Sequence, residues 1–256
     1  MDVNDLKEKY CQIIGDYLEN IGDSSVLCKY LKLKDGRSRF WNCMAIQKAK
    51  NGVLWASINP SGTKKEDDLP EENVLFNQEW NLASPPHTYW GYLIQRIMDI
   101  RDVCGHMDLL PIHIGDEKEI RKMLFTTEDT PERALTVNLL SASQEMIECL
   151  MPRLIIYSNA TTAFLWGTKA NQGIYWMGYE LEEVSGVRLK CWEQGKGTRG
   201  LYRIIGIHKQ SINTSEKTNL VGTYLLIDYQ VGGRQESSGI KKEEVCWLWD
   251  WVKKQK

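Results

Sequence analysis

The clearest hydrophobic pattern in this chain is a short apolar run that ends in a polar corner. Residues 53–58 are almost wholly apolar, lack helical spacing, and lie between Gly52 and Pro60. Such a run predicts a strand buried on both faces of a sheet. The strand would deliver Asn59 to its carboxyl end, where open α/β sheets bind ligands. Asn-Pro-Ser-Gly is also ordinary turn chemistry, so both interpretations stand at this point.

Similar apolar runs alternate with segments that carry apolar residues at helical spacing. Strands are predicted within 103–114 and over 153–159, and helices over 87–100, within 116–151 in two pieces, and from 160 to 166. The alternation predicts an α/β fold, a three-layer sandwich with a central, mostly parallel sheet flanked by helices.

The two ends of the chain add further elements. A helix is predicted from Asn4 or Asp5 to near Gly22, followed by one or two strands within 26–46. Alternation over 187–192 and an apolar run over 202–207 predict a hairpin.

We expect a single domain over 1–256, in which 1–50 forms a helix and strand extension. An amphipathic helix over 240–256 completes it.

Composition narrows the function classes. The chain has 256 residues, 42% hydrophobic and 26% charged, as in ordinary globular proteins. The net charge of −2 and a pI near 6.1 exclude a global basic field, so any contact with a polyanion must be local. Seven dispersed cysteines without a CxxC pair indicate reduced thiols. With no signal segment and no apolar run of membrane-spanning length, we expect a cytoplasmic monomer without a membrane partner.

Several familiar catalytic motifs are not supported. Residues 195–200 match GxGxxG, but they connect predicted antiparallel strands and open no helix, which argues against dinucleotide binding. Arg199 lies in the one concentrated basic region, which favours a local phosphate contact. The spacing of His106, Asp108 and His113 fits no compact metal site, so we expect neither a metal nor another cofactor.

Four polar corners remain at the ends of predicted strands: Asn59, Asp108, Asn159 and His208. In one parallel sheet such corners gather along the same rim, so residues far apart in sequence can converge there. A lone histidine is usually structural. Because His208 directly follows an apolar strand, a structural role and a role in a site are equally supported for it at this point.

The order of these corners resembles the uracil-DNA glycosylase superfamily, especially its mismatch-specific and single-strand-selective branches. The resemblance spans roughly residues 50–225 and is carried by SINPSG, MDLLPI, PRLIIYSNATTAF and IIGIHKQSIN, in that order.

The resemblance implies a role for each corner. Asn59 would position the attacking water, and His208 would bind the base and stabilise its negative charge as it leaves. The resemblance also implies base-binding residues Phe76, Asp108 and Asn159, with Phe76 stacking on a flipped base, a role that Trp80 or Tyr89 could also serve. It implies DNA-binding residues Lys209, Ser211 and Ile212, with Ile212 as the wedge, and the basic region adds Arg199.

Some positions depart from the family pattern. Asp108 stands where the family has a base-reading asparagine, and an ionised carboxylate cannot donate a hydrogen bond to a base oxygen. Asp108 could instead accept from an exocyclic amine, or be protonated by burial. Lys209 replaces the proline of the histidine motif, and Ser57 and Ser61 replace glycines of the first motif.

Three functional hypotheses follow. The first is a DNA glycosylase or related N-glycosidic hydrolase that excises a flipped damaged base from single-stranded or mismatched DNA. The second is a catalytically inert protein of the same fold that binds a nucleotide or nucleic acid. The third is an α/β domain of unrelated function in which the four corners coincide by chance.

Overall fold

The computed structural model describes residues 1–21, 25, 27–31, 43–58, 79–80, 82–83, 89–112, 114, 120, 122–124, 130–170, 175–189, 199–209, 211–212, 217–228 and 239–255. In chain order the elements are α1 (Val3–Ile21), α2 (Cys28–Leu31), β1 (Cys43–Met44), η2 (Ile46–Ala49), β2 (Val53–Ser57), α3 (Tyr89–Ile97), η4 (Met98–Val103), β3 (Cys104–Asp108), α5 (Pro131–Leu150), β4 (Leu154–Tyr157), η5 (Ala160–Trp166), β5 (Tyr179–Glu183), β6 (Gly200–Ile207), β7 (Tyr224–Ile227) and α6 (Lys242–Lys254).

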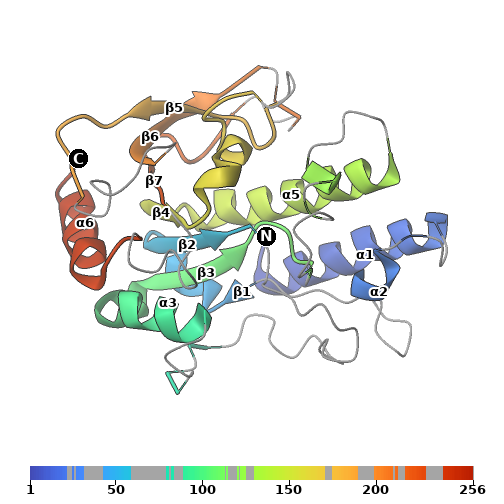
Figure 1. The fold of residues 1–256 in the computed structure, drawn as a ribbon, viewed down its shortest axis with the longest axis horizontal. Helices are drawn as coiled ribbons and strands as arrows, with labels where there is room; N and C mark the ends of the chain where they lie inside the picture. Colours follow the sequence, from blue (N-terminus) through green and yellow to red (C-terminus); the bar gives the residue numbers. More distant parts are fainter. Residues whose placement is uncertain are drawn as a thin grey trace.

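A mixed, mostly parallel sheet forms the centre of the fold (Figure 1). Its strand order is β1-β3-β2-β4-β7-β6-β5. The inner strands β3, β2, β4 and β7 are parallel to one another, whereas β1, β6 and β5 run antiparallel to their neighbours. This arrangement confirms the predicted α/β fold.

The strands are buried on both faces, as their continuous apolar runs require. All five residues of β2 are buried. Leu54 and Ala56 belong to one hydrophobic cluster, and Val53 and Trp55 belong to a second. Because successive strand residues point to opposite faces, the two clusters lie on opposite faces of the sheet.

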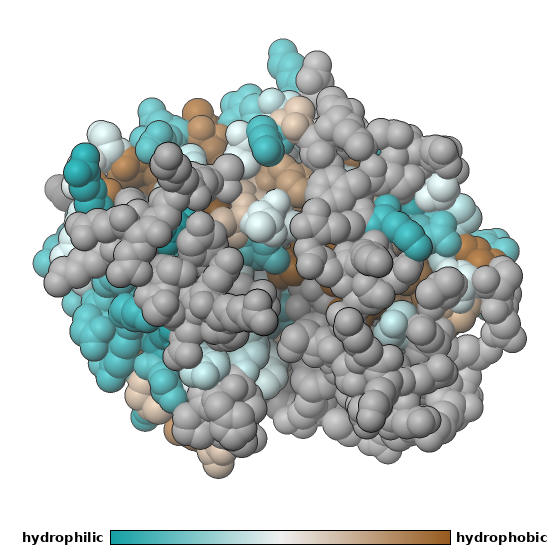
Figure 2. Space-filling model, in the orientation of Figure 1, coloured by the Kyte–Doolittle hydropathy of each residue, from teal (hydrophilic) through white to brown (hydrophobic). Residues whose placement is uncertain are grey.

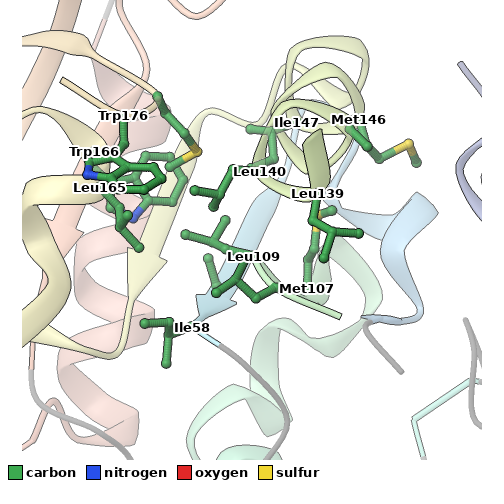
Figure 3. Close-up of a cluster of buried hydrophobic side chains, with 14 of the residues drawn as sticks. Ile58, Met107, Leu109, Leu139, Leu140, Met146, Ile147, Leu165, Trp166 and Trp176 are labelled. Atoms are coloured by element: carbon green, nitrogen blue, oxygen red, sulfur yellow. The ribbon is translucent and has the colours of Figure 1, made fainter. Parts of the chain in front are cut away.

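The first cluster joins the sheet to α1 and α5. Figure 3 shows Leu139 and Leu140 of α5 close to Met107 of β3 and to Leu109, which directly follows β3. All four side chains are buried. Tyr10 of α1 also shares a hydrogen bond with Ser143 of α5, at 2.7 Å between the two oxygens. This buried pair fixes α1 on α5.

The second cluster joins the sheet to α3 and α6. Its helical members are Leu93, Ile94, Ile97, Val245, Leu248, Trp249 and Val252. Figure 2 shows hydrophilic side chains over α6, at the left of the view, so this helix is amphipathic as predicted.

Most predicted elements in the described regions are confirmed, namely α1, α3, α5, α6 and strands β2 and β4. A strand does lie within 103–114, but β3 covers Cys104–Asp108 and ends before most of the apolar stretch MDLLPI that predicted it. The strand prediction within 26–46 is wrong at Cys28–Leu31, which forms α2, and right only at Cys43–Met44. Residues 32–42 lie outside the described residues.

The predicted hairpin has a different first strand. Residues 187–189 form no strand, and β6 pairs with β5 instead. Val187 and Leu189 are buried in the second cluster without strand pairing, so loop burial gives the same alternating pattern as a half-buried strand.

No helix within the described part of the chain combines the length and apolar character needed to cross a bilayer.

Two glycines provide a test of the packing. A Cβ on Gly105 of β3 would lie 2.7 Å from the Ala45 carbonyl oxygen and 2.8 Å from Ile46 Cα, whereas a Cβ on Gly15 of α1 meets nothing within 4 Å. We predict that Gly105→Ala lowers the free energy of unfolding by about 1–3 kcal/mol through overpacking. Gly15→Ala should raise it by about 0.5–1 kcal/mol, because alanine favours the helix. Denaturant unfolding measures both, and equal stability of the two variants would contradict the described packing.

Candidate functional site

Four polar residues lie side by side at the carboxyl ends of the parallel strands. Ser57 pairs in register with Asp108. The Ser158 amide donates to the Ala56 carbonyl and the Asp228 amide to the Tyr157 carbonyl, which continues the same register across β4 and β7. We call Asp108, Ser57, Ser158 and Asp228, in this spatial order, the polar row. Each of the four is between 0 and 7% exposed.

The polar row crosses the point where the strand order reverses. From β2 the chain goes to β3 on one side, and then to β4 on the other side of β2. Open α/β sheets bind ligands at such a switch point, outside the carboxyl ends of the strands. The hydroxyl oxygens of Ser57 and Ser158 lie 3.1 Å apart across it, so they form a hydrogen bond between β2 and β4.

Two aromatic residues complete the Asp108 end of the row. Tyr89, the first residue of α3, shares a hydrogen bond with the Ser57 hydroxyl. His106 Nε2 lies 3.3 Å from the Tyr89 hydroxyl oxygen and 3.4 Å from Ser57 Oγ. Its ring also meets the Trp90 ring edge-on, at 4.8 Å between centroids. The hydroxyls of α3 and β2 therefore share one buried network with the imidazole.

Burial sets the charge of this network. It lowers the pKa of His106 to about 3 and raises the pKa of Asp108 well above its usual range. Burial, and next the charge of Asp108, raises the pKa of Tyr89. His106 Nε2 and Asp108 Oδ1 are 3.9 Å apart, close enough to count as an ion pair but too far for a hydrogen bond. We assign the pair to its neutral forms, because both side chains are buried and the gap between them is long.

The other end of the row carries a charged pair. Arg199 Nη1 lies 3.6 Å from Asp228 Oδ1, and both side chains are at most 3% exposed. The second oxygen of Asp228 accepts a hydrogen bond from the Ile240 amide. The Ile240 carbonyl in turn accepts from Arg96 Nε of α3, at 2.9 Å. Helix α3 is thus linked to Ser57 through Tyr89 and to Asp228 through Ile240.

Besides Arg199, two of the predicted site residues lie at this rim. Asp108 belongs to the polar row, and Asn159 follows Ser158 directly, where its side-chain oxygen accepts a hydrogen bond from the Thr161 hydroxyl at 2.6 Å. Asn59 and Phe76 lie outside the described residues. The backbone is described as far as Ile58, whose carbonyl accepts from the Leu110 amide, so β2 and β3 remain paired up to the residue before Asn59.

His208 lies at the opposite rim, so the expectation that all four corners share one rim is wrong. Strand β6 is antiparallel to β7, with Gly200 beside Ile227 and Arg203 beside Tyr224. Its last residues therefore extend past the amino end of β7. There the His208 ring stacks on Tyr175 at 3.9 Å between centroids, and its Nδ1 lies 3.8 Å from Glu180 Oε1.

The residues after His208 share its location. The Ser211 hydroxyl donates to the Trp176 carbonyl at 2.9 Å. The Ile212 amide donates to the Tyr175 carbonyl, and the Ile212 side chain packs against the first cluster. Lys209 is exposed beside them. None of these three can contact a ligand at the polar row, because the sheet separates the two rims.

Arg199 also differs from its prediction. We expected a solvent-facing phosphate contact at a hairpin tip, but its side chain is buried beside Asp228 at the carboxyl rim. Because β6 begins where β7 ends, the residue before β6 lies next to the residue after β7.

Sequence reasoning named Ser57 only as a motif position and Tyr89 only as an alternative stacking residue, and it missed Ser158, Asp228 and His106 as members of the site. A signal was present for Asp228, since the apolar run 225–227 ends in it as the apolar run 154–157 ends in Ser158. Within the described ranges, no three His, Cys, Asp or Glu side chains are grouped so as to hold a metal ion.

Comparisons with known proteins add no family. A scan against models of protein families gives no match, and a search of curated proteins finds none either.

We predict that His106 makes the fold sensitive to acid. Its folded-state pKa of about 3 lies below the ordinary value of 6.5, so the stability it contributes is present above pH 6.5 and is lost as pH falls toward 3. Below pH 6.5 the free energy of unfolding should fall by about 1.4 kcal/mol per pH unit from this group alone. Denaturant unfolding of the wild type and His106→Gln over this range measures the effect. The variant should show the shallower slope, and identical slopes would refute the assignment of a neutral buried histidine.

Proposed function

We propose that this protein is an N-glycosidic hydrolase similar to uracil-DNA glycosylases, which takes a base extruded from DNA at the carboxyl rim of its sheet. The observation that carries the proposal is the polar row, four buried polar side chains in one register across the switch point of the sheet. A planar base needs fixed donors and acceptors at its edge, and the row provides hydroxyl and carboxyl groups in a water-poor setting.

The sequence resemblance assigns roles within this rim. Asn59, two residues after the end of β2, would hold the attacking water, and Asp108 at the end of β3 would contact the base edge. Water adds its oxygen to the anomeric carbon, and the electron pair of the N-glycosidic bond leaves with the base. The proton released by the water ends on the base or in solvent.

The location of His208 changes one role in this scheme. A group at the amino rim cannot meet negative charge on a base bound at the carboxyl rim. We assign that role to rim donors, the Tyr89 hydroxyl and the Arg199 guanidinium, which are fixed by their contacts with Ser57 and Asp228. Pre-set donors of this kind need little reorganisation when charge develops on the leaving group.

Two finer points belong to the same proposal. The two hydrophobic clusters support a three-layer sandwich, with α1 and α5 covering one face of the sheet and α3 and α6 the other.

The proposed partner is single-stranded or mismatched DNA, held through local contacts because the net charge is −2.

The position of His208 also favours a second candidate. A chain that lacks the histidine at its rim could bind a nucleotide or nucleic acid without cleaving it. In this alternative the polar row still recognises the base, and only the chemistry is missing.

Single-turnover excision assays test the proposal. With enzyme in excess over single-stranded and mismatched DNA carrying uracil or hypoxanthine, the wild type should form abasic sites. Asn59→Ala should lower the rate about a hundredfold or more, as removal of a positioned catalytic group does. Asn20→Ala, an exposed change near the end of α1, is the matched control.

His208→Ala decides between the two arrangements of the site. It should leave excision at the wild-type rate if the rim donors carry the charge, and abolish it if the histidine does. Abasic product from none of these DNAs would reject the hydrolase. DNA binding that weakens linearly on a logarithmic salt scale, without cleavage, would then favour the binding protein.

A further inference from the structure

We propose that this protein forms a two-fold symmetric homodimer through an exposed flank of the sheet beside strand β6 and helix α6. The partner that fits this flank is a second copy of the same chain. The proposal does not rest on the hydrolase, because no residue of the polar row takes part in it. It replaces the monomer expected from the sequence.

The flank begins at the strand where α6 stops covering the sheet. Trp251 of α6 meets Tyr224, the first residue of β7, with its ring edge-on at 5.1 Å between centroids. Arg203 of β6 lies directly opposite Tyr224 in the antiparallel register and is exposed. Opposed residues of an antiparallel pair lie on the same face of the sheet. The face that α6 covers at β7 is therefore open to solvent at Arg203.

Two exposed aliphatic side chains, Ile205 and Val221, lie next to Arg203. Their exposed fractions are 48% and 62%. The Gly222 amide donates to the Ile204 carbonyl, so the turn before β7 lies beside the residue that precedes Ile205. A Cβ on Gly222 would be 3.8 Å from Arg203 Nη2, which places the guanidinium over the same turn. Exposed apolar residues that gather around an arginine indicate an interaction surface.

A β-bulge sets the position of Ile205. In the pairing of β6 with β5, Ile204 lies opposite Leu181 and Gly206 lies opposite Glu180, so Ile205 has no partner on β5. Such a bulge re-aims the side chain of its extra residue. The irregularity therefore directs a large aliphatic side chain into solvent within an otherwise regular strand.

An exposed tryptophan extends the flank onto α6. Trp247 is 48% exposed and lies one helical turn before Trp251, so the two share one side of the helix. Trp251 in turn contacts Tyr224, the neighbour of Arg203. Tryptophan, tyrosine and arginine are the residues that most often dominate the energy of a protein interface. The dimer flank consists of Arg203, Ile205, Val221, Tyr224, Trp247 and Trp251.

The charges around the dimer flank decide which partner fits it. Glu182 of β5 is exposed directly opposite Arg203, on the same face of the sheet, and exposed Asp250 and Lys254 carry both signs on α6. A surface of mixed sign repels part of any uniformly charged partner. A two-fold axis that passes midway between Arg203 and Glu182 instead places each of them against its opposite charge in the other copy. The net charge of −2 adds little repulsion between two copies.

The mass of the protein in solution is the first test. In sedimentation velocity or light scattering, the wild type should approach twice the monomer mass of 29.6 kDa as its concentration rises to about 100 μM, since interfaces of standard size bind with micromolar affinity or better. A mass that stays at 29.6 kDa over this range would overturn the proposal.

A charge introduced into the apolar part of the flank tests its location. Val221→Glu should raise the dissociation constant of the dimer by about tenfold or more, because the interface would bury an unpaired carboxylate. Leu82→Glu is the matched control. Leu82 is likewise an exposed large apolar residue, but it follows Trp80, whose indole binds the Cys104 carbonyl of β3 on the far side of the sheet order. Equal effects of the two changes, or no effect of Val221→Glu, would reject this flank as the interface.

Charge reversal separates a contact between copies from a contact within one chain. Arg203→Glu and Glu182→Arg each place like charges against one another across the two-fold axis, so each variant alone should dimerise more weakly than the wild type. An equimolar mixture of the two variants should recover the wild-type dissociation constant, because each reversed charge then meets its opposite in the other copy. A mixture that dimerises no better than its components would contradict the proposed symmetry.

A different occupant of the flank gives a different result. If the wild type stays monomeric, and if Arg203→Glu weakens its binding to a fluorescently labelled oligo(dT) strand, the flank belongs to nucleic acid and the dimer is rejected. Abasic-site formation does not enter any of these measurements, so the dimer and the hydrolase can fail separately.

Discussion

The register of the parallel strands is the constraint on which the site depends. Because β3, β2, β4 and β7 pair without offset at their carboxyl ends, four polar side chains from four distant segments lie in one row. A shift of one residue in any strand would send its polar side chain to the other face of the sheet and put an apolar one in its place. The packing of the two hydrophobic clusters therefore fixes the chemistry of the rim as well as the fold.

Burial then restricts what these side chains can do. A polar group taken out of water must find a hydrogen bond or lose its charge. Ser57 and Ser158 take the first course, through their mutual bond and the bond from Ser57 to Tyr89. For His106 and Asp108, burial also favours the neutral form. The result is a rim with little net charge at one end and a compensated charge pair at the other, which suits a neutral planar ligand better than an ion.

The sequence predicted the strands of this sheet better than their directions. An apolar run such as 154–157 indicates burial on both faces, and a polar residue after it marks an end, so β2 and β4 could be predicted from the pattern. Nothing in the run 202–207 distinguishes a parallel strand from an antiparallel one. Its direction is set by pairing with β7, through contacts between Arg203 and Tyr224 that no local pattern encodes. Because β6 was taken for a parallel strand, His208 was predicted at the wrong rim. Asp228 was missed because the fourth parallel strand is β7, which Asp228 follows.

Helix α3 is connected to two members of the polar row, Ser57 and Asp228. Tyr89 at its start binds Ser57, and Arg96 near its end binds the Ile240 carbonyl, whose amide in turn binds Asp228. Displacement of this one helix breaks both connections together. We therefore expect hydrogen exchange of the amide protons along α3 to report on the order of the site.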